Sequence, residues 1–197
     1  MKAGWELKKL DDVCIVERGS SPRPIKNYFT TDASGVNWLK IGDVSKDSKY
    51  VYTTEQKITQ DGAKQSRFVK DGDFVLTNSM SFGRPYIMKT TGYIHDGWFV
   101  LRLKDSIYSE YLYYLLTSPL VQTQFNHLAS GAIVKNISGD LVKKAKLPIP
   151  PLSEQHRIVT IIDQAFEGVS KTRANAEQNL QNARALFESH LQSVFTQ

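Results

Sequence analysis

The C-terminal stretch of the chain, residues 153–197, reads SEQHRIVTIIDQAFEGVSKTRANAEQNLQNARALFESHLQSVFTQ. Mostly apolar or small residues recur in it every seven positions from Val159 and again from Ile162, three places later. This is the a/d pattern of a helix that packs along a second helix. At about 1.5 Å per residue the helix would be roughly 60 Å long, far longer than the mean globular helix. The pattern therefore predicts a long C-terminal coiled-coil helix.

The two sets of repeating positions form a seam, which we expect to lie in a dimer interface. Its members are Val159, Ile162, Phe166, Val169, Arg173, Ala176, Leu180, Ala183 and Phe187. Prolines between residues 148 and 151 cannot continue a helix backwards, so we expect Ser153 to be the N-cap and Glu154 to lie in the positive first turn. The alanines and the polar Arg173 also fit a terminal helix folded back on its own domain, and this alternative stays open.

Length and composition indicate one globular domain, residues 1–150, followed by the helix, residues 151–197. The chain has 197 residues, of which 41% are hydrophobic, enough for an ordinary core. Its single cysteine, Cys14, excludes an internal disulfide and a multi-cysteine zinc site. No apolar run reaches transmembrane length, and the first residues lack the apolar core of a signal peptide. We therefore expect a cytoplasmic protein.

Positive charge is concentrated in the globular part. Residues 1–150 contain 21 Lys and Arg against 15 Asp and Glu, whereas residues 151–197 contain 4 against 5. The globular part also holds 18 of the 21 aromatic residues. This distribution is compatible with a nucleic-acid surface. A solvated, mildly basic face has the same composition, so charge alone does not decide between the two.

Local patterns predict a mixture of short strands and short helices ahead of the long helix. Strands are expected at residues 5–10, 36–41, 86–89, 93–94 and 98–103, and on both sides of an Asp-Gly turn within residues 68–76. Helical segments are expected at residues 11–17, 59–66, 109–117 and 118–129, and after Ser138. The expected fold class is α/β (α+β): a globular, β-rich domain followed by a long helix.

Three polar loops are candidates for DNA contact. Arg, Lys, Asn and Ser side chains reach phosphates and base edges, and neighbouring Gly and Pro residues shape the backbone. The candidate residues are Arg18, Ser20, Ser21, Arg23, Lys26, Asn78, Ser79, Ser81, Arg84, Lys135 and Asn136. Each loop also fits a solvated connection between strands, and the sequence leaves that alternative open.

Two pairs of neighbouring side chains resemble catalytic or metal-binding groups only superficially. His95 and Asp96 are adjacent, and adjacent residues of a strand point to opposite faces, so we interpret them as turn residues. Asp71 and Asp73 flank a glycine in a common turn sequence and have no third ligand nearby. We therefore expect no catalytic residue and no metal site.

Residues 147–159 read LPIPPLSEQHRIV. This segment resembles the junction "xIPxPPLxEQxxIV" of the specificity subunits of type I restriction-modification enzymes, where a target-recognition domain meets a spacer helix. Three further pieces stand in the family's order. Residues 5–10, WELKKL, are similar to its opening; residues 70–73, KDGD, to its "kxGD" turn; and residues 131–137, GAIVKNI, to the stretch before the junction. Together they are more specific than any one of them.

The resemblance implies a β-rich α/β domain that recognises one half of a split DNA target. It also implies a helix that packs antiparallel to a second helix and docks methyltransferase subunits. The usual subunit carries two such domains and two helices, whereas this chain resembles a half-length form whose second helix would come from another copy. Its expected partners are double-stranded DNA, methyltransferase subunits and, through the complex, a restriction subunit. S-adenosylmethionine, ATP and Mg²⁺ are expected on the partner subunits, and no cofactor on this chain.

Two other classes of protein would require different motifs. A methyltransferase would need a glycine-rich cofactor loop and an Asn-Pro-Pro-Tyr type motif, and a helicase-nuclease would need a Gly-Lys-Ser/Thr phosphate loop. Neither pattern occurs in the sequence, so we expect a non-catalytic subunit. The remaining alternative is a coiled-coil protein-interaction adaptor without DNA specificity, which a DNA-binding measurement would distinguish.

Overall fold

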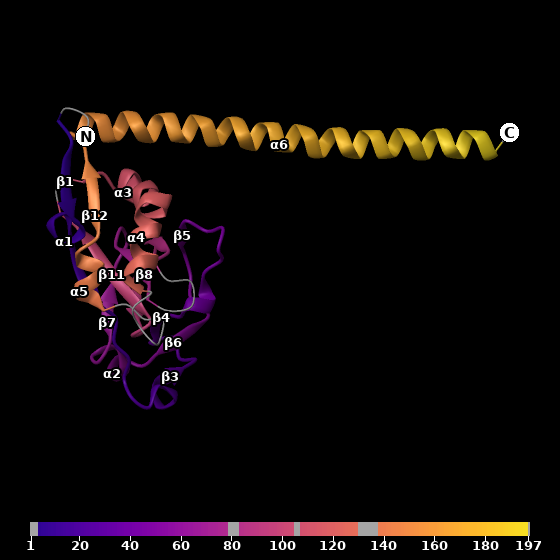
Figure 1. The fold of residues 1–197 in the computed structure, drawn as a ribbon. Coiled ribbons are helices and arrows are strands. Elements are labelled where there is room, and N and C mark those ends of the chain that lie inside the picture. Colours follow the sequence, from indigo (N-terminus) through magenta and orange to yellow (C-terminus); the bar gives the residue numbers. More distant parts are fainter. Residues whose placement is uncertain (1–3, 79–82, 105–106, 130–137, 197) are drawn as a thin grey trace. The chain divides into compact units, whose positions relative to one another are not determined.

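The computed structural model describes residues 4–78, 83–104, 107–129 and 138–196. The chain divides into two compact units, Met1–Gln155 and His156–Gln197. The first unit contains the β-sheets and the short helices, and the second consists of most of the long helix (Figure 1). The predicted fold class is confirmed: mixed α/β with a long C-terminal helix. Across the described residues, no helix combines the length and apolarity needed to cross a membrane.

One five-stranded sheet has the order β2-β11-β8-β9-β5. Its strands are β2 (Cys14–Arg18), β5 (Tyr50–Val51), β8 (Phe74–Thr77), β9 (Pro85–Met88) and β11 (Trp98–Leu103). All neighbours are antiparallel except β5 and β9. β8 and β9 are buried along their whole length, which explains why their sequences are continuously apolar rather than alternating.

The second five-stranded sheet has the order β3-β6-β4-β10-β7. Its strands are β3 (Phe29–Thr30), β4 (Val36–Leu39), β6 (Gln56–Ile58), β7 (Arg67–Val69) and β10 (Gly92–Ile94). The predicted turn at residues 70–73 is present, with Gly72 at φ +83°, but β7 and β8 on either side of it do not pair. β7 joins β10 and β8 joins β9 and β11, so the turn carries the chain from one sheet to the other.

A hydrophobic core lies between these two sheets. Its buried members come from strands of both: Leu39, Val51, Val69, Val75, Tyr86, Met88, Ile94, Trp98 and Val100. On β11, Trp98 and Val100 face this core, whereas Phe99 faces the opposite way, toward Gly139 at the start of α5. Full burial of a large apolar side chain such as Phe99 contributes about 1.5–3 kcal/mol to the free energy of folding.

Short helices cover the outer faces. The helices α3 (Ser109–Thr117), α4 (Pro119–Ala129) and α5 (Gly139–Lys143) follow the first sheet in the chain, close to the predicted bounds. Ser138 caps α5 as predicted, because its Oγ accepts from the backbone of Leu141. A smaller core of Trp38, Ile58 and Ala63 packs beneath α2 (Gln60–Ala63) and the 3-10 turn η1 (Ile25–Tyr28). A second 3-10 turn, η2, spans Ile41–Asp43.

Part of the predicted helix at residues 11–17 is wrong. Only α1 (Leu10–Val13) is helical, and Cys14 begins β2. Cys14 and Val16 are buried while Ile15 is exposed, the two-residue period of a half-buried strand. Pairing with β11 therefore overrides any local helical tendency.

A strand that the sequence did not predict, β12 (Lys146–Ile149), precedes the long helix. It pairs antiparallel with β1 (Glu6–Lys9), so that Pro148 lies opposite Leu7 in a two-stranded ribbon (Figure 1). Proline is tolerated there because each strand has an unpaired edge. The long helix α6 spans Leu152–Phe195. The amides of Glu154 and Gln155 donate to the carbonyl of Pro151, so Pro151 and not the predicted Ser153 occupies the capping position.

Gln155 holds this junction together. Its side chain is buried, with 1% exposed. Its Oε1 accepts from the backbone amide of Tyr108 at 2.8 Å, and its Nε2 donates to the carbonyl of Pro150 at 3.0 Å. Nearby, Tyr111 Oη donates to the carbonyl of Pro148 at 2.7 Å. Burial, assisted by the charge of Glu154, raises the pKa of Tyr111 to about 12, so the phenol keeps this proton.

We predict that Gln155→Met lowers the free energy of unfolding by about 2–4 kcal/mol, because a buried amide and a buried carbonyl lose their partners. Gln181→Met is the matched control, since Gln181 is exposed on the same helix, and it should change stability by less than about 0.5 kcal/mol. Urea unfolding followed by tryptophan fluorescence measures both. Equal stability of the two variants would show that Gln155 does not hold the junction.

Candidate nucleic-acid interface

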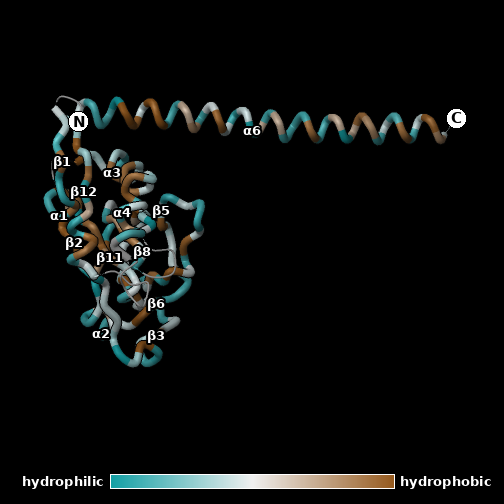
Figure 2. The backbone as a smooth tube through the Cα atoms, in the orientation of Figure 1, coloured by the Kyte–Doolittle hydropathy of each residue, from teal (hydrophilic) through white to brown (hydrophobic). Residues whose placement is uncertain are grey.

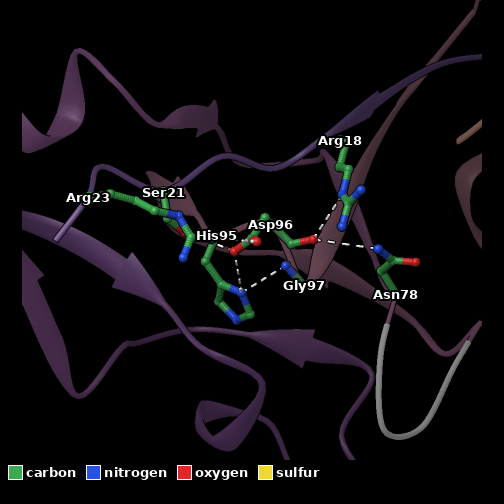
Figure 3. A network of polar contacts seen from close by, with 7 residues as sticks. All are labelled: Arg18, Ser21, Arg23, Asn78, His95, Asp96 and Gly97. Atoms are coloured by element: carbon green, nitrogen blue, oxygen red, sulfur yellow. Dashed lines mark hydrogen bonds and ion pairs between the residues drawn. The ribbon is translucent and has the colours of Figure 1, made fainter. Parts of the chain in front are cut away.

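The turn of residues 95–97, which joins β10 to β11, is a hub for two distant segments (Figure 3). Two backbone hydrogen bonds join the loop after β2 to the residues that flank this turn. The amide of Gly19 donates to Trp98 O at 2.8 Å, and the amide of Ser20 donates to Ile94 O at 3.2 Å. The residue after β8 is attached in the same way, because the Asn78 amide donates to Gly97 O at 2.8 Å. The turn therefore fixes where the first two candidate loops leave the sheet.

Both carboxylate oxygens and the backbone carbonyl of Asp96 accept hydrogen bonds from these segments. Ser21 Oγ donates to Oδ1 at 3.0 Å, and Arg23 Nη2 forms an ion pair with Oδ2 at 3.1 Å. The backbone carbonyl of Asp96 accepts from Arg18 Nε at 3.1 Å and from Asn78 Nδ2 at 3.5 Å (Figure 3). One acidic residue thus orients both arginines of the first candidate loop.

The electrostatics keep this carboxylate charged. Partial burial of Asp96 alone would raise its pKa. The hydrogen bonds from Ser21 and from its own backbone amide, together with the charge of Arg23, outweigh burial and lower the pKa below its ordinary value. Asp96 is therefore ionised at neutral pH and holds Arg23 by charge as well as by a hydrogen bond.

His95 is neutral, and its tautomer follows from its hydrogen bond. Burial lowers its pKa more than the charges of Asp96 and Asp43 raise it. Its Nδ1 accepts from the amide of Gly97 at 2.8 Å, so the ring proton is on Nε2. The 3.8 Å approach of Nδ1 to Asp96 is therefore no ion pair.

Gly19 is required by close packing. A Cβ built on it would lie 2.0 Å from the carbonyl oxygen of His95, a distance that no side chain tolerates. Only glycine lets the loop approach the turn closely enough for the bonds that hold it.

The structure places the predicted DNA-contact residues in different surroundings. Arg18, Arg23 and Lys26 are exposed, and Ser20 and Ser21 are half-buried beside them. Asn78 is fully buried, with its amide turned to Asp96, so it supports the hub rather than facing solvent. Four predicted residues lie outside the described part of the chain: Ser79, Ser81, Lys135 and Asn136.

Arg84 does not join the Asp96 hub. Its backbone amide donates to Thr77 Oγ1 at 3.0 Å, and its half-buried side chain acts electrostatically on Tyr86 and Tyr113. Of the candidate residues that the structure describes, those of the first loop and Asn78 lie together around the Asp96 turn.

Sequence reasoning interpreted His95 and Asp96 correctly as turn residues but missed what the turn holds. The contact depends on β2 pairing with β11, which places Val16 opposite Leu101, 85 residues later in the chain (101 − 16). A carboxylate in a short turn directly before a long apolar strand was the only local signal. Among the described residues, no cluster of three or more His, Cys, Asp or Glu side chains is arranged to hold a metal ion.

On α6, the predicted seam differs in exposure along its length. Val159 is 4% exposed and Ile162 is half-buried. From Phe166 onward the seam residues are exposed, including Phe166 at 59%, Leu180 at 55% and Phe187 at 67%. Hydrophobic segments recur along the whole helix in Figure 2.

The chain matches the family model "Type I restriction modification DNA specificity domain" over residues 2–181. It therefore belongs to this family of specificity domains, as the motifs indicated, and the family agrees with the expectation of a non-catalytic subunit.

This chain matches the relatives and solved structures named below over less than half of their own length. The chain is 28% identical over 191 residues to the type I restriction enzyme MjaIX specificity subunit of Methanocaldococcus jannaschii, covering 94% of this chain and 43% of that protein. It is 25% identical over 185 residues to the EcoKI specificity subunit of Escherichia coli K12, covering 89% and 39%.

Two solved structures share the fold. One is the HsdS subunit from Thermoanaerobacter tengcongensis, with a TM-score of 0.66 and 24% identity, covering 86% of this chain and 39% of that one. The other comes from work on the complex assembly and conformational transition of the type I R-M system, with a TM-score of 0.73 and 23% identity, covering 93% and 44%.

We predict that Asp96→Asn lowers the free energy of unfolding at pH 7 by about 0.5–1 kcal/mol, a modest loss because the carboxylate is 44% exposed and screened by solvent. Since the folded-state pKa of Asp96 is lowered, its contribution is complete above the unfolded pKa of about 3.9 and disappears as pH falls through the folded value. The difference from wild type should therefore shrink between pH 5 and strongly acidic pH.

Urea unfolding at several pH values measures this difference. Asp32→Asn is the control, because the Asp32 side chain is exposed and has no ion pair among the described residues. A wild-type-to-Asp96→Asn difference that stays constant down to acidic pH would contradict the assignment of the stabilisation to the charged carboxylate.

Proposed function

We propose that this chain is the DNA-recognition part of a type I restriction-modification specificity subunit, and that its globular unit reads one half of a split target. One observation carries the proposal. The exposed Arg18 and Arg23 are held on a single turn in a chain that matches the DNA specificity family over residues 2–181. Arginine presents a rigid fork of donors that suits phosphates and guanine edges.

The geometry suits recognition because the arginines are oriented before DNA arrives. Arg18 is fixed through Nε, and within the described residues its terminal nitrogens have no hydrogen-bond partner. Arg23 is fixed through one terminal nitrogen, and its side chain is 78% exposed. Both keep donors for DNA while their conformational freedom is already reduced, which lowers the entropy cost of binding. Lys26, exposed in the same loop, adds positive charge.

The chain acts by positioning DNA rather than by chemistry. In this proposal, partner methyltransferase subunits bind S-adenosylmethionine and carry out the transfer, whereas ATP and Mg²⁺ serve the restriction subunit. Residues of this chain supply the contacts that decide which DNA is presented.

We propose that α6 supplies the assembly surface and that two copies associate along its exposed seam. A helix with Phe166, Val169, Leu180 and Phe187 exposed at 55–67% presents a long apolar stripe. At about 100° per residue, Leu191 continues this stripe better than the heptad position His190, so the seam shifts phase near its C-terminal end.

We predict that Arg18→Ala combined with Arg23→Ala weakens binding to duplex DNA selected from a random pool by about tenfold or more, at 1–3 kcal/mol per lost base contact. Where the contacts are to phosphate, the slope of log affinity against log salt should fall by about one per contact. The control, Lys171→Ala with Arg184→Ala, removes the same charge from exposed positions of α6. Fluorescence anisotropy at several salt concentrations measures both.

If the double variant binds like wild type at every salt concentration, the first loop does not contact DNA. The selected sequences carry a second result. A two-fold symmetric pair of chains should select an interrupted palindrome, because each copy reads the same half-site on opposite strands.

We predict that Phe166→Glu combined with Leu180→Glu converts a self-associated chain to a monomer at micromolar concentration, because two charges would be buried in an apolar interface. Gln164→Glu with Ser189→Glu adds the same charge on the opposite side of the helix and should leave the assembly intact. Light scattering measures the mass of each. A wild-type chain that is already monomeric at this concentration would argue against self-association through α6.

A further inference from the structure

Beside the Asp96 turn, the loop after β2 and strand β4 enclose a pocket of about 470 Å³. This is within the range of pockets that bind small molecules. Aromatic rings line it. Phe29 is 38% exposed, and Trp38 is 2% exposed and lies deeper. The rings of Trp38 and His95 have centroids 6.2 Å apart and are inclined by 46°. Phe29 therefore gives the pocket an accessible aromatic wall, and Trp38 is buried behind the surface.

Positive side chains line the same pocket: Arg23, Lys26 and Lys40. Lys40 Nζ lies 3.5 Å from a carboxylate oxygen of Glu55, whose side chain is 74% exposed. Lys26 has no ion pair among the described residues. A solvent-exposed pair such as Lys40–Glu55 contributes little, so Lys40 is easily redirected to a stronger anion such as phosphate.

His95 adds a directed hydrogen-bond donor. Its Nδ1 is occupied by the Gly97 amide, and the proton is on Nε2. Within the described residues Nε2 has no hydrogen-bond partner, and the side chain, which is 22% exposed, lines the pocket. This N–H is therefore available to an acceptor on a ligand that enters the pocket.

We propose that this pocket binds one nucleotide, with its base against Phe29, a base acceptor on His95 Nε2–H, and its phosphate at Lys26 and Lys40. The proposal rests on the proposed function, because DNA supplies the nucleotide when one base leaves the stack. A free nucleotide has the same chemistry, and the experiment separates the two sources.

The combination of groups favours a nucleotide over simpler ligands. Inorganic phosphate would use the lysines and leave the aromatic walls without contact. An apolar ligand would use Phe29 but leave His95 Nε2–H unsatisfied. Stacking of bases on exposed aromatic side chains is a main source of affinity for unpaired nucleotides, so Phe29 should supply a large share of it.

Two variants remove the base contacts with little change elsewhere. His95→Asn keeps an acceptor near the position of Nδ1, for the Gly97 amide, and removes the Nε2 donor. Phe29→Ala removes the exposed aromatic wall. Its matched control is Phe68→Ala, since Phe68 is 44% exposed on β7 and is not among the pocket residues. Urea unfolding of each variant verifies that the fold is retained.

The first measurement uses the full chain and the duplex selected from the random pool. A mismatch is introduced at each position in turn, and affinity is measured by anisotropy. Because a mismatch lowers the cost of unstacking a base, the duplex with its mismatch at one particular position should bind wild type about 3- to 10-fold more tightly. The gain should persist in Phe68→Ala and disappear in His95→Asn and Phe29→Ala.

The second measurement titrates the four deoxynucleoside monophosphates into labelled full chain and follows the indole resonance of Trp38 by NMR. A shift in wild type that is absent in His95→Asn, without a mismatch effect in DNA, supports a nucleotide site filled from free nucleotides. Normal binding of the selected duplex with neither a mismatch effect nor an indole shift overturns the pocket and leaves the proposed function intact.

A chain that binds no duplex overturns the proposed function instead. In that case the indole titration alone decides the pocket: a shift that His95→Asn abolishes supports a free-nucleotide site, and no shift overturns it.

Discussion

Arg18 lies opposite Phe99 in the antiparallel pairing of β2 with β11, and this register decides where the basic loop leaves the sheet. Because β11 is also paired with β8, the turn that precedes it meets the ends of both neighbours. Gly19 and Asn78 then bond to the same turn. The position of the basic loop thus depends on backbone pairing inside a buried sheet, which is far more rigid than a surface loop alone.

An acidic residue bonded to a basic loop is at first sight unfavourable for binding an anion. Asp96 cancels one positive charge, but its carboxylate and carbonyl restrict Ser21, Arg23, Arg18 and Asn78 at once. The exposed arginines would otherwise lose up to about 2 kcal/mol of side-chain entropy each on binding. The arrangement weakens the long-range attraction of DNA but fixes the orientation of the arginines. Sequence discrimination requires that orientation.

The junction before the long helix follows a similar logic. Prolines end β12 and remove amide donors, and the carbonyls that remain are satisfied by Gln155 and Tyr111. Gln155 also accepts from the start of α3 through the Tyr108 amide. A side chain with both a donor and an acceptor is needed at this position, which gives the glutamine of the recognised junction segment a physical reason.

Several features followed directly from local pattern. The helices at residues 109–117 and 119–129, the capping role of Ser138 and the long C-terminal helix were predictable because helix signals lie within one or two turns of the chain. Family membership followed from short motifs in order. The sites of DNA contact and self-association stay predictions.

Other features depend on contacts between distant segments. Nothing near residues 70–73 indicates that β7 and β8 belong to different sheets, and nothing near Asn78 indicates that it is buried. The roles of Asp96 and His95 arise only when β2 pairs with β11. Local sequence determines helices because their hydrogen bonds join residues four apart, whereas strand partners, and the loops they bring together, are chosen by packing across the whole domain.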